Sequence, residues 1–323
     1  MNVVLGFDTS CYTTSAAAVN AQGCVIGSCR MLLPVPSGQR GLRQSEAVFA
    51  HVRQLPQVME ELAGALERAD AHVCAVAASQ APREGEESYM PVFAVGCGQA
   101  KVVASALRVP CYFVSHQQGH IAAGQIGGPE QGSRFVALHV SGGTTDLLLS
   151  DNGKLRELGG SLDLHAGQLV DRIGVAMGLP FPAGPALEAL ALQCREKPQA
   201  LLPASMERGD LRCHLSGAEA QCMRILAKQA LPPEAVALEV FDFLARTIAR
   251  LLAAGCAGEK VSSALVVGGV ASSGLLRGLV LARLQKAGSH IQVFFGKPEF
   301  SADNAAGVAL LGMKQYVLAH GRG

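Results

Sequence analysis

The chain has 323 residues, of which 49% are hydrophobic and 16% are charged, and its formal net charge is +1. This composition supplies a large apolar core and excludes an intrinsically disordered chain. It also excludes a protein that binds nucleic acid through an overall basic charge, so any basic surface must be assembled by folding or supplied by another subunit.

The N-terminus, MNVVLGFDTS, has no basic region followed by a long apolar run and is interpreted as a first strand. No segment carries about 18 uninterrupted apolar residues, the length that spans a bilayer. The ten cysteines include no C-x-x-C pair. They are interpreted as buried thiols in a reducing compartment, and neither a disulfide framework nor a zinc ribbon is expected. We therefore expect a soluble cytoplasmic protein.

Two stretches of the chain share one pattern. Residues 3–30 predict a strand, a tight polar turn, a second strand, a turn at NAQG and a third strand. Residues 134–160 predict the same series, with SGGTT and DNG at the two turns. Apolar runs of strand length broken by Gly, Asn and Asp are typical of such meanders. The pattern indicates a duplication.

Helical and further strand patterns follow each meander. In the first half we expect helices at 45–68, bent at Pro56, and at 91–107, with a strand at 72–79. In the second half the predicted helices are 163–178, 185–196, 217–230, 233–256, 273–287 and 303–319, and the predicted strands are 264–269 and 291–295.

The chain twice shows meandering strands followed by helices that alternate with parallel strands. This pattern predicts two related α/β lobes. The glycine-rich polar stretch 124–134 places the boundary, so the expected lobes are residues 1–128 and 129–323. Duplications of this kind commonly bind a ligand in the cleft between the halves.

Three glycine-bearing turns lie in the second half: SGGTT at 141–145, AGP at 183–185 and GGVASSG at 268–274. Glycine lets backbone amides approach a ligand closely, and a turn that opens a helix offers free amides to an anion. The alternative is that each turn needs glycine only for its own geometry. Taken together the three favour a phosphate cradle, and none matches a P-loop or a dinucleotide fingerprint.

Asp171 lies in the predicted helix at 163–178. Its carboxylate has the chemistry to bind the two ribose hydroxyls of a nucleotide. The alternative is a solvated position on the helix surface.

His116 and His120 are four positions apart in SHQQGH. On a helix they project from one face, close enough to chelate one metal ion, although they can equally cap or decorate a short helix. A stable site needs a third ligand, for which Asp303 is a candidate; its alternative role is the N-cap of the following helix. Because Gln117 stands where a zinc protease has glutamate, protease chemistry is disfavoured.

The chain resembles the tRNA adenosine threonylcarbamoyltransferases, a family formerly described as glycoproteases. The resemblance runs nearly end to end and rests on GFDTSCYTTSAAAV, SHQQGH, VSGGTTDLLL, the stretch from GGSLDLHAGQ to PAGPALEALA, HLSGAEAQCMR, LVVGGVASSGLLR and SADNAAGVALLG, in the family's order. It implies the actin-like, sugar-kinase and Hsp70-type ATPase fold.

The resemblance also implies a set of site residues. The metal ligands would be His116, His120 and Asp303, holding one divalent ion, iron or zinc. The phosphate of an adenylate would face SGGTT, the ribose Asp171 and Gly184, and the adenine GGVASS. The implied substrate- and nucleotide-binding residues are Ser141, Gly142, Gly143, Thr144, Gly167, Asp171, Gly184, Gly269 and Ser273.

The implied reaction transfers a threonylcarbamoyl group from threonylcarbamoyl-AMP to the adenine on the 3′ side of the anticodon in tRNA. The implied partners are a small metal-free paralogue, a small P-loop ATPase and tRNA, with no membrane; a dimer is also compatible. The amphipathic stretch at 45–66 is a candidate surface for the paralogue, or else packs within its own lobe.

The chain departs from the family's usual residues near the nucleotide. Tyr12 and Thr13 replace an acidic pair, Thr144 replaces histidine, Gln168 replaces glutamate, and Ser273 replaces asparagine. A glycine-rich loop before the helix at 91 has also become APREGEES. A metal-dependent transferase is the leading hypothesis. The alternatives are a non-catalytic or repurposed nucleotide-binding paralogue that scaffolds or regulates a true transferase, and an ATP-dependent kinase of the same fold.

Overall fold

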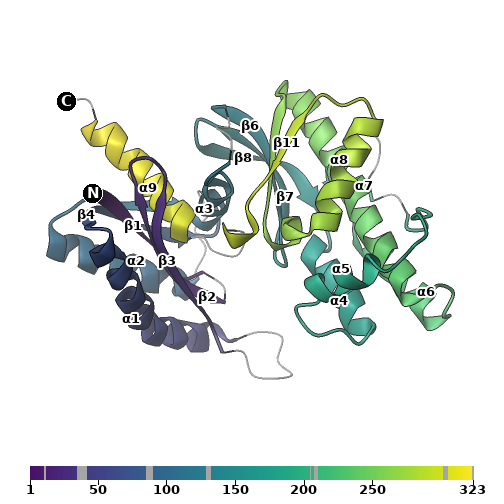
Figure 1. Ribbon diagram of the computed structural model, residues 1–323, viewed down its shortest axis with the longest axis horizontal. Coiled ribbons are helices and arrows are strands. Elements are labelled where there is room, and N and C mark those ends of the chain that lie inside the picture. The colour runs from purple at the N-terminus through teal and green to yellow at the C-terminus, as the bar shows by residue number, and fades with distance from the viewer. Residues whose placement is uncertain are drawn as a thin grey trace. The chain divides into compact units, whose positions relative to one another are not determined.

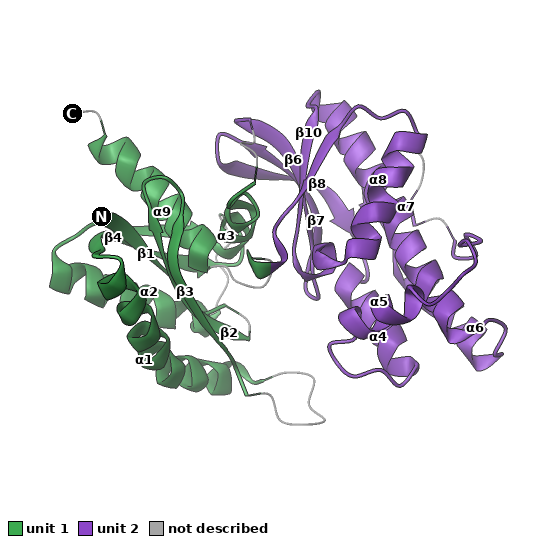
Figure 2. Ribbon diagram, viewed as in Figure 1, with its two compact units in different colours: residues 1–129, 299–323 green, residues 130–298 purple. Residues whose placement is uncertain are grey.

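The computed structural model describes residues 1–10, 12–34, 42–84, 90–128, 132–203, 205–206, 210–300 and 305–321. The chain divides into two compact units (Figure 2). The first unit joins residues Met1–Pro129 to Glu299–Gly323, and the second unit is Glu130–Pro298.

The first unit contains a five-stranded mixed sheet (Figure 1). Its strands, in spatial order, are β3 (Val25–Leu32), β2 (Thr13–Asn20), β1 (Asn2–Asp8), β4 (His72–Ala81) and β5 (Cys111–Ser115). The first three strands form an antiparallel meander, whereas β4 and β5 run parallel to β1.

Helices cover both faces of this sheet. On one face α1 (Gln44–Arg68) and α2 (Pro91–Leu107) pack on a cluster that includes Val3, Leu5 and Phe7 of β1. The alternate residue Val4 instead packs in a cluster with Val308 of α9 (Ala305–His320). Because both faces are buried, residues 3–7 of β1 are all apolar and do not alternate with polar residues.

The second unit repeats the plan in a six-stranded sheet. Its strands, in spatial order, are β11 (Gln292–Phe295), β10 (Ser263–Val267), β6 (Arg134–Val140), β7 (Thr145–Asp151), β8 (Lys154–Ser161) and β9 (Arg212–Cys213). Here β6, β7 and β8 form the antiparallel meander, and β10 and β11 run parallel to β6. Strand β6 thus corresponds to β1, and β10 to β4.

The helices of the second unit gather around its longest helix. They are α4 (Ala166–Ala176), α5 (Gly184–Ala191), α6 (Ser216–Ala227) and α8 (Gly274–Lys286), and the longest helix is α7 (Pro233–Glu259). A short 3₁₀ turn, η1 (Gly269–Ser272), precedes α8, and a second one, η2 (Pro298–Phe300), spans the boundary between the two units. Helix α7 contacts β6, β7 and β10 and is itself contacted by the other four helices. Its burial over most of its length explains its apolar sequence.

The duplicated α/β architecture predicted from the two meanders is confirmed. The helix predicted at 91–107 has those bounds, and the helix expected at 45–68 continues through Pro56 as α1. Strands β5 and β9 were not predicted from the sequence, and β9 has only two residues. Both depend on neighbouring strands for pairing.

The division of the chain differs from the expected lobes at the C-terminus. The first unit ends within one residue of the expected boundary, but the segment from Glu299 onward belongs to it and not to the second unit. The cause is packing of α9 on the first sheet. A Cβ on Gly6 would lie 2.3 Å from the carbonyl oxygen of Ala305, so the helix rests directly on β1.

Across the described ranges, no helix combines the length and the apolar character needed to cross a membrane.

Candidate functional site

The histidine pair lies in the first unit on α3 (His116–Ala123), a short helix that follows β5 directly. Ser115 caps this helix: its hydroxyl accepts from the Gln118 amide at 3.1 Å, and its own amide donates to the Gln118 side chain at 2.8 Å. This capping box starts the helix at His116. The spacing therefore places both imidazoles on one face, as the sequence predicts.

The two imidazoles meet at their Nε2 atoms. Nε2 of His116 and Nε2 of His120 are 3.1 Å apart, and the rings lie edge to face with centroids 4.5 Å apart. Both histidines are partly buried.

A buried carboxylate lies on the opposite side of the His116 ring. Oδ2 of Asp8 is 3.1 Å from His116 Nδ1, and the Ser10 hydroxyl is 2.7 Å from the same nitrogen. Asp8 is 3% exposed and also accepts hydrogen bonds from the hydroxyls of Ser10 and Ser79. The end of β1 thus supports the helix that carries the histidines.

Asp8 is held ionised by these neighbours. Burial raises the pKa of the carboxyl, but the charge and hydrogen bond of His116, with the Ser79 and Ser10 hydroxyls, more than offset it. The net effect is a pKa well below the usual range.

Helix α9 packs against α3 beside the histidine pair. A Cβ on Gly307 would lie 1.9 Å from the carbonyl oxygen of Gly119, the residue before His120. Only glycine allows this approach. The first turn of α9 is therefore held next to the helix that carries the histidines.

Asp303, the expected third ligand, lies outside the described residues, two positions before α9. Within the described part of the chain, no group of three or more His, Cys, Asp or Glu side chains is arranged to hold a metal ion. The described geometry therefore supplies two of the three ligands that the sequence indicates.

The SGGTT motif forms the tip of the β6–β7 hairpin in the second unit. The Ser141 amide donates to the Thr144 carbonyl at 2.8 Å, and Gly142 and Gly143 are exposed, with nothing within 4 Å of a Cβ on either. The motif is thus a hairpin turn that leads into a strand and not into a helix. Its two glycines nevertheless leave open space beside their backbone.

The hairpin packs on the first turn of α4. The Gly167 amide donates to the Ser141 carbonyl at 3.0 Å, and a Cβ on Gly167 would lie 2.7 Å from Gly142 Cα. The Ala166 amide donates to the Thr145 hydroxyl at 2.8 Å. Because both α4 amides are already engaged, any anion here would contact the hairpin amides and not the end of α4.

Asp171 links α4 to the AGP turn. Its Oδ1 accepts the Ala183 amide at 2.8 Å, and burial raises the pKa of the carboxyl against the lowering effect of that bond. Gly184 follows, and a Cβ there would make only an ordinary contact, 3.8 Å from Val170. Packing therefore does not require glycine at 184.

The GGVASS turn follows β10 and lies against the end of β6. Gly268 has a φ of +102°, and a Cβ there would lie 2.3 Å from the Val140 carbonyl oxygen, whereas Gly269 has open space. The Ser273 hydroxyl caps α8 by accepting the Leu276 amide, and Glu188 of α5 accepts the Leu275 amide at 2.8 Å. Within the turn, the Ala271 amide donates to the Gly268 carbonyl at 3.0 Å and the Ser273 amide to the Val270 carbonyl at 3.3 Å.

The predicted nucleotide-binding residues therefore gather at one edge of the second unit. The hairpin tip contacts α4, and α4 contacts η1. The Asp171 carboxylate accepts a hydrogen bond from the residue before α5, and the Glu188 carboxylate accepts one from the first turn of α8. This is the carboxyl edge of β6 and β10. In open α/β sheets ligands bind at that edge.

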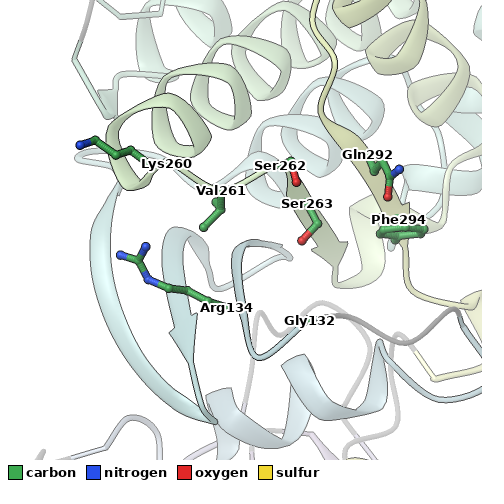
Figure 3. A pocket seen from close by; sticks show the side chains of 8 residues that line it. All are labelled: Gly132, Arg134, Lys260, Val261, Ser262, Ser263, Gln292 and Phe294. Carbon is green, nitrogen blue, oxygen red and sulfur yellow. The ribbon is translucent and has the colours of Figure 1, made fainter.

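A separate cavity of about 470 Å³ lies at the other edge of the same sheet (Figure 3). Its lining includes the first residue of each of three strands, namely Arg134 of β6, Ser263 of β10 and Gln292 of β11. Phe294 and Lys260 also line it. The guanidinium of Arg134 is engaged by Glu259 at 2.9 Å. This cavity contains none of the predicted site residues.

Four residues of these sites were not predicted from the sequence. Asp8 and Ser10 contact His116 Nδ1, Ser79 donates to Asp8, and Glu188 accepts from the first turn of α8. A polar DTS at the end of an apolar strand was the available signal for the first two. Ser79 and Glu188 have no local signal, because their partners are 71 and 87 positions away.

The solved structures that resemble this chain share its fold. It matches HypF from T. kodakarensis with a TM-score of 0.64 and 12% identity, over 98% of this chain and 48% of that one. It matches a ROK family glucokinase from Streptomyces griseus with a TM-score of 0.51 and 17% identity, over 97% and 99% of the two chains. The fold is that of the actin-like ATPases and sugar kinases.

Sequence comparison identifies the family. The model of the TsaD family, tRNA N6-adenosine threonylcarbamoyltransferase, matches residues 37–310. Proteins of that name from Thiobacillus denitrificans and Aromatoleum aromaticum are each 30% identical to this chain, over 97% and 96% of its length and 91% and 90% of theirs. This chain therefore belongs to the TsaD family of transferases.

Proposed function

We propose that this chain transfers a threonylcarbamoyl group from threonylcarbamoyl-AMP to the exocyclic amine of the adenine 3′ of the tRNA anticodon. Membership of the TsaD family supports the reaction. We further propose that the reaction depends on one divalent metal, iron or zinc. The observation that carries this dependence is the 3.1 Å separation of the two imidazole Nε2 atoms.

The imidazole pair fits a metal ion. Imidazole nitrogens bind zinc at about 2.0–2.1 Å, so two of them 3.1 Å apart would subtend about 100° at a shared ion. That angle lies close to the tetrahedral and octahedral values. The fit requires both Nε2 atoms to present lone pairs, which a neutral imidazole does when its proton is on Nδ1.

Asp303 is proposed as the third ligand. Ala305 begins α9, and the two peptide units between the residues span at most about 7 Å. The contact of Gly307 with Gly119 holds the start of α9 beside His120. A carboxylate from this stretch would complete a His₂Asp set with open positions for substrate.

The second unit is proposed to bind the adenylate. The exposed backbone of Gly142 and Gly143, with the hydroxyls of Ser141 and Thr144, suits a phosphate, and the Gly143 amide would exchange its 3.3 Å bond to the Ser141 hydroxyl for one to the ligand. The Asp171 oxygen that does not accept from Ala183 suits a ribose hydroxyl, with Gly184 leaving room beside it.

Gly269 to Ser273 would contact the adenine base, and Gly167 has an indirect role, since it allows the hairpin to pack on α4.

When bound, the ion would supply Lewis-acid polarisation of the mixed anhydride. The residues of this chain would hold the ion and stabilise the leaving group. His116, His120 and Asp303 would hold the ion at a fixed point, and the hairpin backbone would stabilise the negative charge that grows on the departing phosphate. The adenine amine of the tRNA forms the new bond to the carbamoyl carbon as AMP leaves.

The experiment combines metal analysis with a transfer assay. The purified chain should contain iron or zinc near one equivalent, and it should restore threonylcarbamoyladenosine in a strain that lacks its own transferase. His116→Ala should abolish both. His72→Ala, at an exposed histidine of the same unit, is the matched control and should change neither. A chain with neither metal nor adenylate affinity would contradict the proposal.

A second candidate function rests on the departures from the family. Tyr12, which replaces an acidic residue, is 44% exposed, so a carboxylate that other members present there is missing. A chain that binds metal and adenylate but fails to restore the modified nucleoside would be a repurposed paralogue that scaffolds or regulates a true transferase.

The partners are proposed from the family and from α1. This helix buries Leu55, Val58 and Leu62 against its own sheet, while Phe49 and Val52 are 63% and 53% exposed. We propose that this exposed face binds the small metal-free paralogue, and that a small P-loop ATPase and tRNA join the assembly, with a dimer as a further arrangement. A cytoplasmic location follows from a tRNA substrate.

A further inference from the structure

The hydrogen bonds around Asp8 determine where the proton of His116 lies. Oδ1 of Asp8 accepts from the Ser79 hydroxyl and from the Ser10 amide at 3.2 Å. Oδ2 accepts from the Ser10 hydroxyl at 2.9 Å and lies 3.1 Å from His116 Nδ1. A carboxylate that receives this many donors is ionised and can only accept. The contact with His116 therefore needs a proton on Nδ1.

The second neighbour of Nδ1 leads to the same result. The Ser10 hydroxyl is 2.7 Å from Nδ1, and its own proton is directed to Asp8 Oδ2. Toward the ring, the serine oxygen is thus an acceptor as well. Both of these groups require an N–H at Nδ1, and when the imidazole is neutral, as it has to be to bind a metal ion, that N–H carries its single proton. Nε2 of His116 is then left with its lone pair.

That lone pair faces the metal position. Nε2 of His116 points at Nε2 of His120, 3.1 Å away. Asp8, Ser10 and Ser79 are each at most 3% exposed, so water does not compete for the hydrogen bonds that fix the ring. A histidine whose Nδ1–H is tied to a carboxylate keeps both its tautomer and its ring orientation.

We propose that Asp8 is a positioning residue for the histidine pair: assisted by Ser10 and Ser79, it holds His116 as the Nδ1–H tautomer with Nε2 ready to bind a metal ion. This inference rests on the proposed metal site and extends it to residues that contact neither the ion nor the substrate. Asp8 acts through His116, and the hydroxyls of Ser10 and Ser79 keep its carboxylate in place.

The test uses Asp8→Asn in the full chain, with zinc alone as the probe. The dissociation constant for zinc should rise by about 10- to 100-fold, the usual effect of losing such a partner. Nitrogen NMR of the metal-free protein should show His116 as the Nδ1–H tautomer in the wild type and as a mixture of tautomers in the variant. A residue that only stabilised the fold would not change the tautomer.

Two further variants keep the test decisive. Thr14→Val removes another buried hydroxyl of the first unit, one that contacts His51 and Gln54, and should leave zinc affinity unchanged. Ser79→Ala keeps the carboxylate but removes one of its donors, and should weaken zinc binding several-fold even if Asp8→Asn does not fold.

The outcomes separate this inference from the proposed function. Equal zinc affinity in the wild type and Asp8→Asn, or a wild-type His116 that carries its proton on Nε2, overturns the role of Asp8. A wild-type chain that binds no metal contradicts the proposed metal site instead, and the tautomer of the metal-free protein still decides whether Asp8 positions His116.

Discussion

The two units place different chemistry at the same pair of positions. In the first unit Asp8 ends β1, and Ser79 of the neighbouring strand β4 donates to it, one residue beyond the paired Phe7 and Ala78. In the second unit Val140 ends β6, and Gly268 lies one residue beyond β10, against the Val140 carbonyl. Asp8 and Ser79 of the first unit therefore occupy the positions that Val140 and Gly268 occupy in the second unit.

The difference shows how one fold supports two kinds of site. The duplicated sheet determines that its carboxyl edge is available for binding, and the residues at the strand ends determine what binds there. A buried carboxylate has to be surrounded by donors, and in the first unit one of those donors is the candidate metal ligand His116. In the second unit the hairpin glycines leave open space beside their backbone.

The largest expected effect comes from Gly307→Ala, which tests the first site. The new Cβ would lie 1.9 Å from the Gly119 carbonyl oxygen, so α9 must move away from α3. We expect a loss of about 3 kcal/mol in the free energy of unfolding and weaker zinc binding. Denaturant titration measures the free energy of unfolding, and calorimetry measures the zinc affinity.

Gly98→Ala is the control for that variant, because a Cβ at this exposed position in α2 would meet nothing within 4 Å. It should be neutral or stabilise by up to about 1 kcal/mol. Unchanged zinc affinity in Gly307→Ala would mean that the α3–α9 contact does not support the metal site.

Gly167→Ala makes the corresponding change in the second unit. Its Cβ would lie 2.7 Å from both Gly142 Cα and Gly142 N and would push the hairpin off α4. We expect about 2 kcal/mol of destabilisation and weaker AMP binding, with zinc affinity unchanged. Gly258→Ala, on exposed helix with free space, is the control. If zinc and AMP affinities fall together, the two edges are not independent sites.

Asp163 provides a pH-dependent comparison with Asp8, because this carboxylate of the second unit binds mainly backbone amides. Burial opposes its ionisation, but the Ser216 hydroxyl and the amides of Leu215, Leu164 and Ser216 lower its pKa to about 2. Its stabilising contribution should be complete above the unfolded pKa of about 3.9 and be lost as the pH falls toward 2.

Asp163→Asn should therefore lower the free energy of unfolding at pH 7 by about 1 to 2 kcal/mol and flatten its slope between pH 4 and pH 2. Unfolding titrations across this range measure both quantities. Asp70→Asn, at a side chain that is 94% exposed, should change neither. An unaltered slope in Asp163→Asn would rule out this carboxylate as the source of the acid sensitivity.

The smallest effect is expected at Ser273, one of the departures from the family. Ser273→Ala removes the cap of α8 and should cost about 1 kcal/mol in thermal unfolding. Ser273→Asn, the residue usual in the family, should restore it, since both side chains cap helices equally well. A failure of asparagine to restore stability would show that serine has a different role here.

Two of the departures keep the local geometry intact. Gln168 accepts from the His165 amide at 3.1 Å as part of the box that starts α4, and glutamate would do the same. Ser273 caps α8 as asparagine would. The replacements at Tyr12, Thr13 and Thr144 change the chemistry of their side chains, and they are where any change of substrate would arise.

Local sequence predicted most of the elements and the placing of His116 and His120 on one face of a helix. The two meanders, α2 and the one-turn spacing of His116 and His120 follow from apolar periodicity, turn residues and capping, which act within a few positions. The same signals located the glycine turns at 141–145 and 268–274, and the meander pattern placed the first of them between two strands, where the β6–β7 hairpin lies.

The tertiary structure determined which of these elements and side chains lie close together. The sequence by itself determined the strands, the helices and the identity of the chemical groups, because these depend on neighbours along the chain. Only folding brought Ser79 to Asp8, which is 71 positions away in the sequence. Only folding, likewise, placed α9 in the first unit, next to α3. Burial and pairing between distant segments decide such contacts, and no local pattern carries that information.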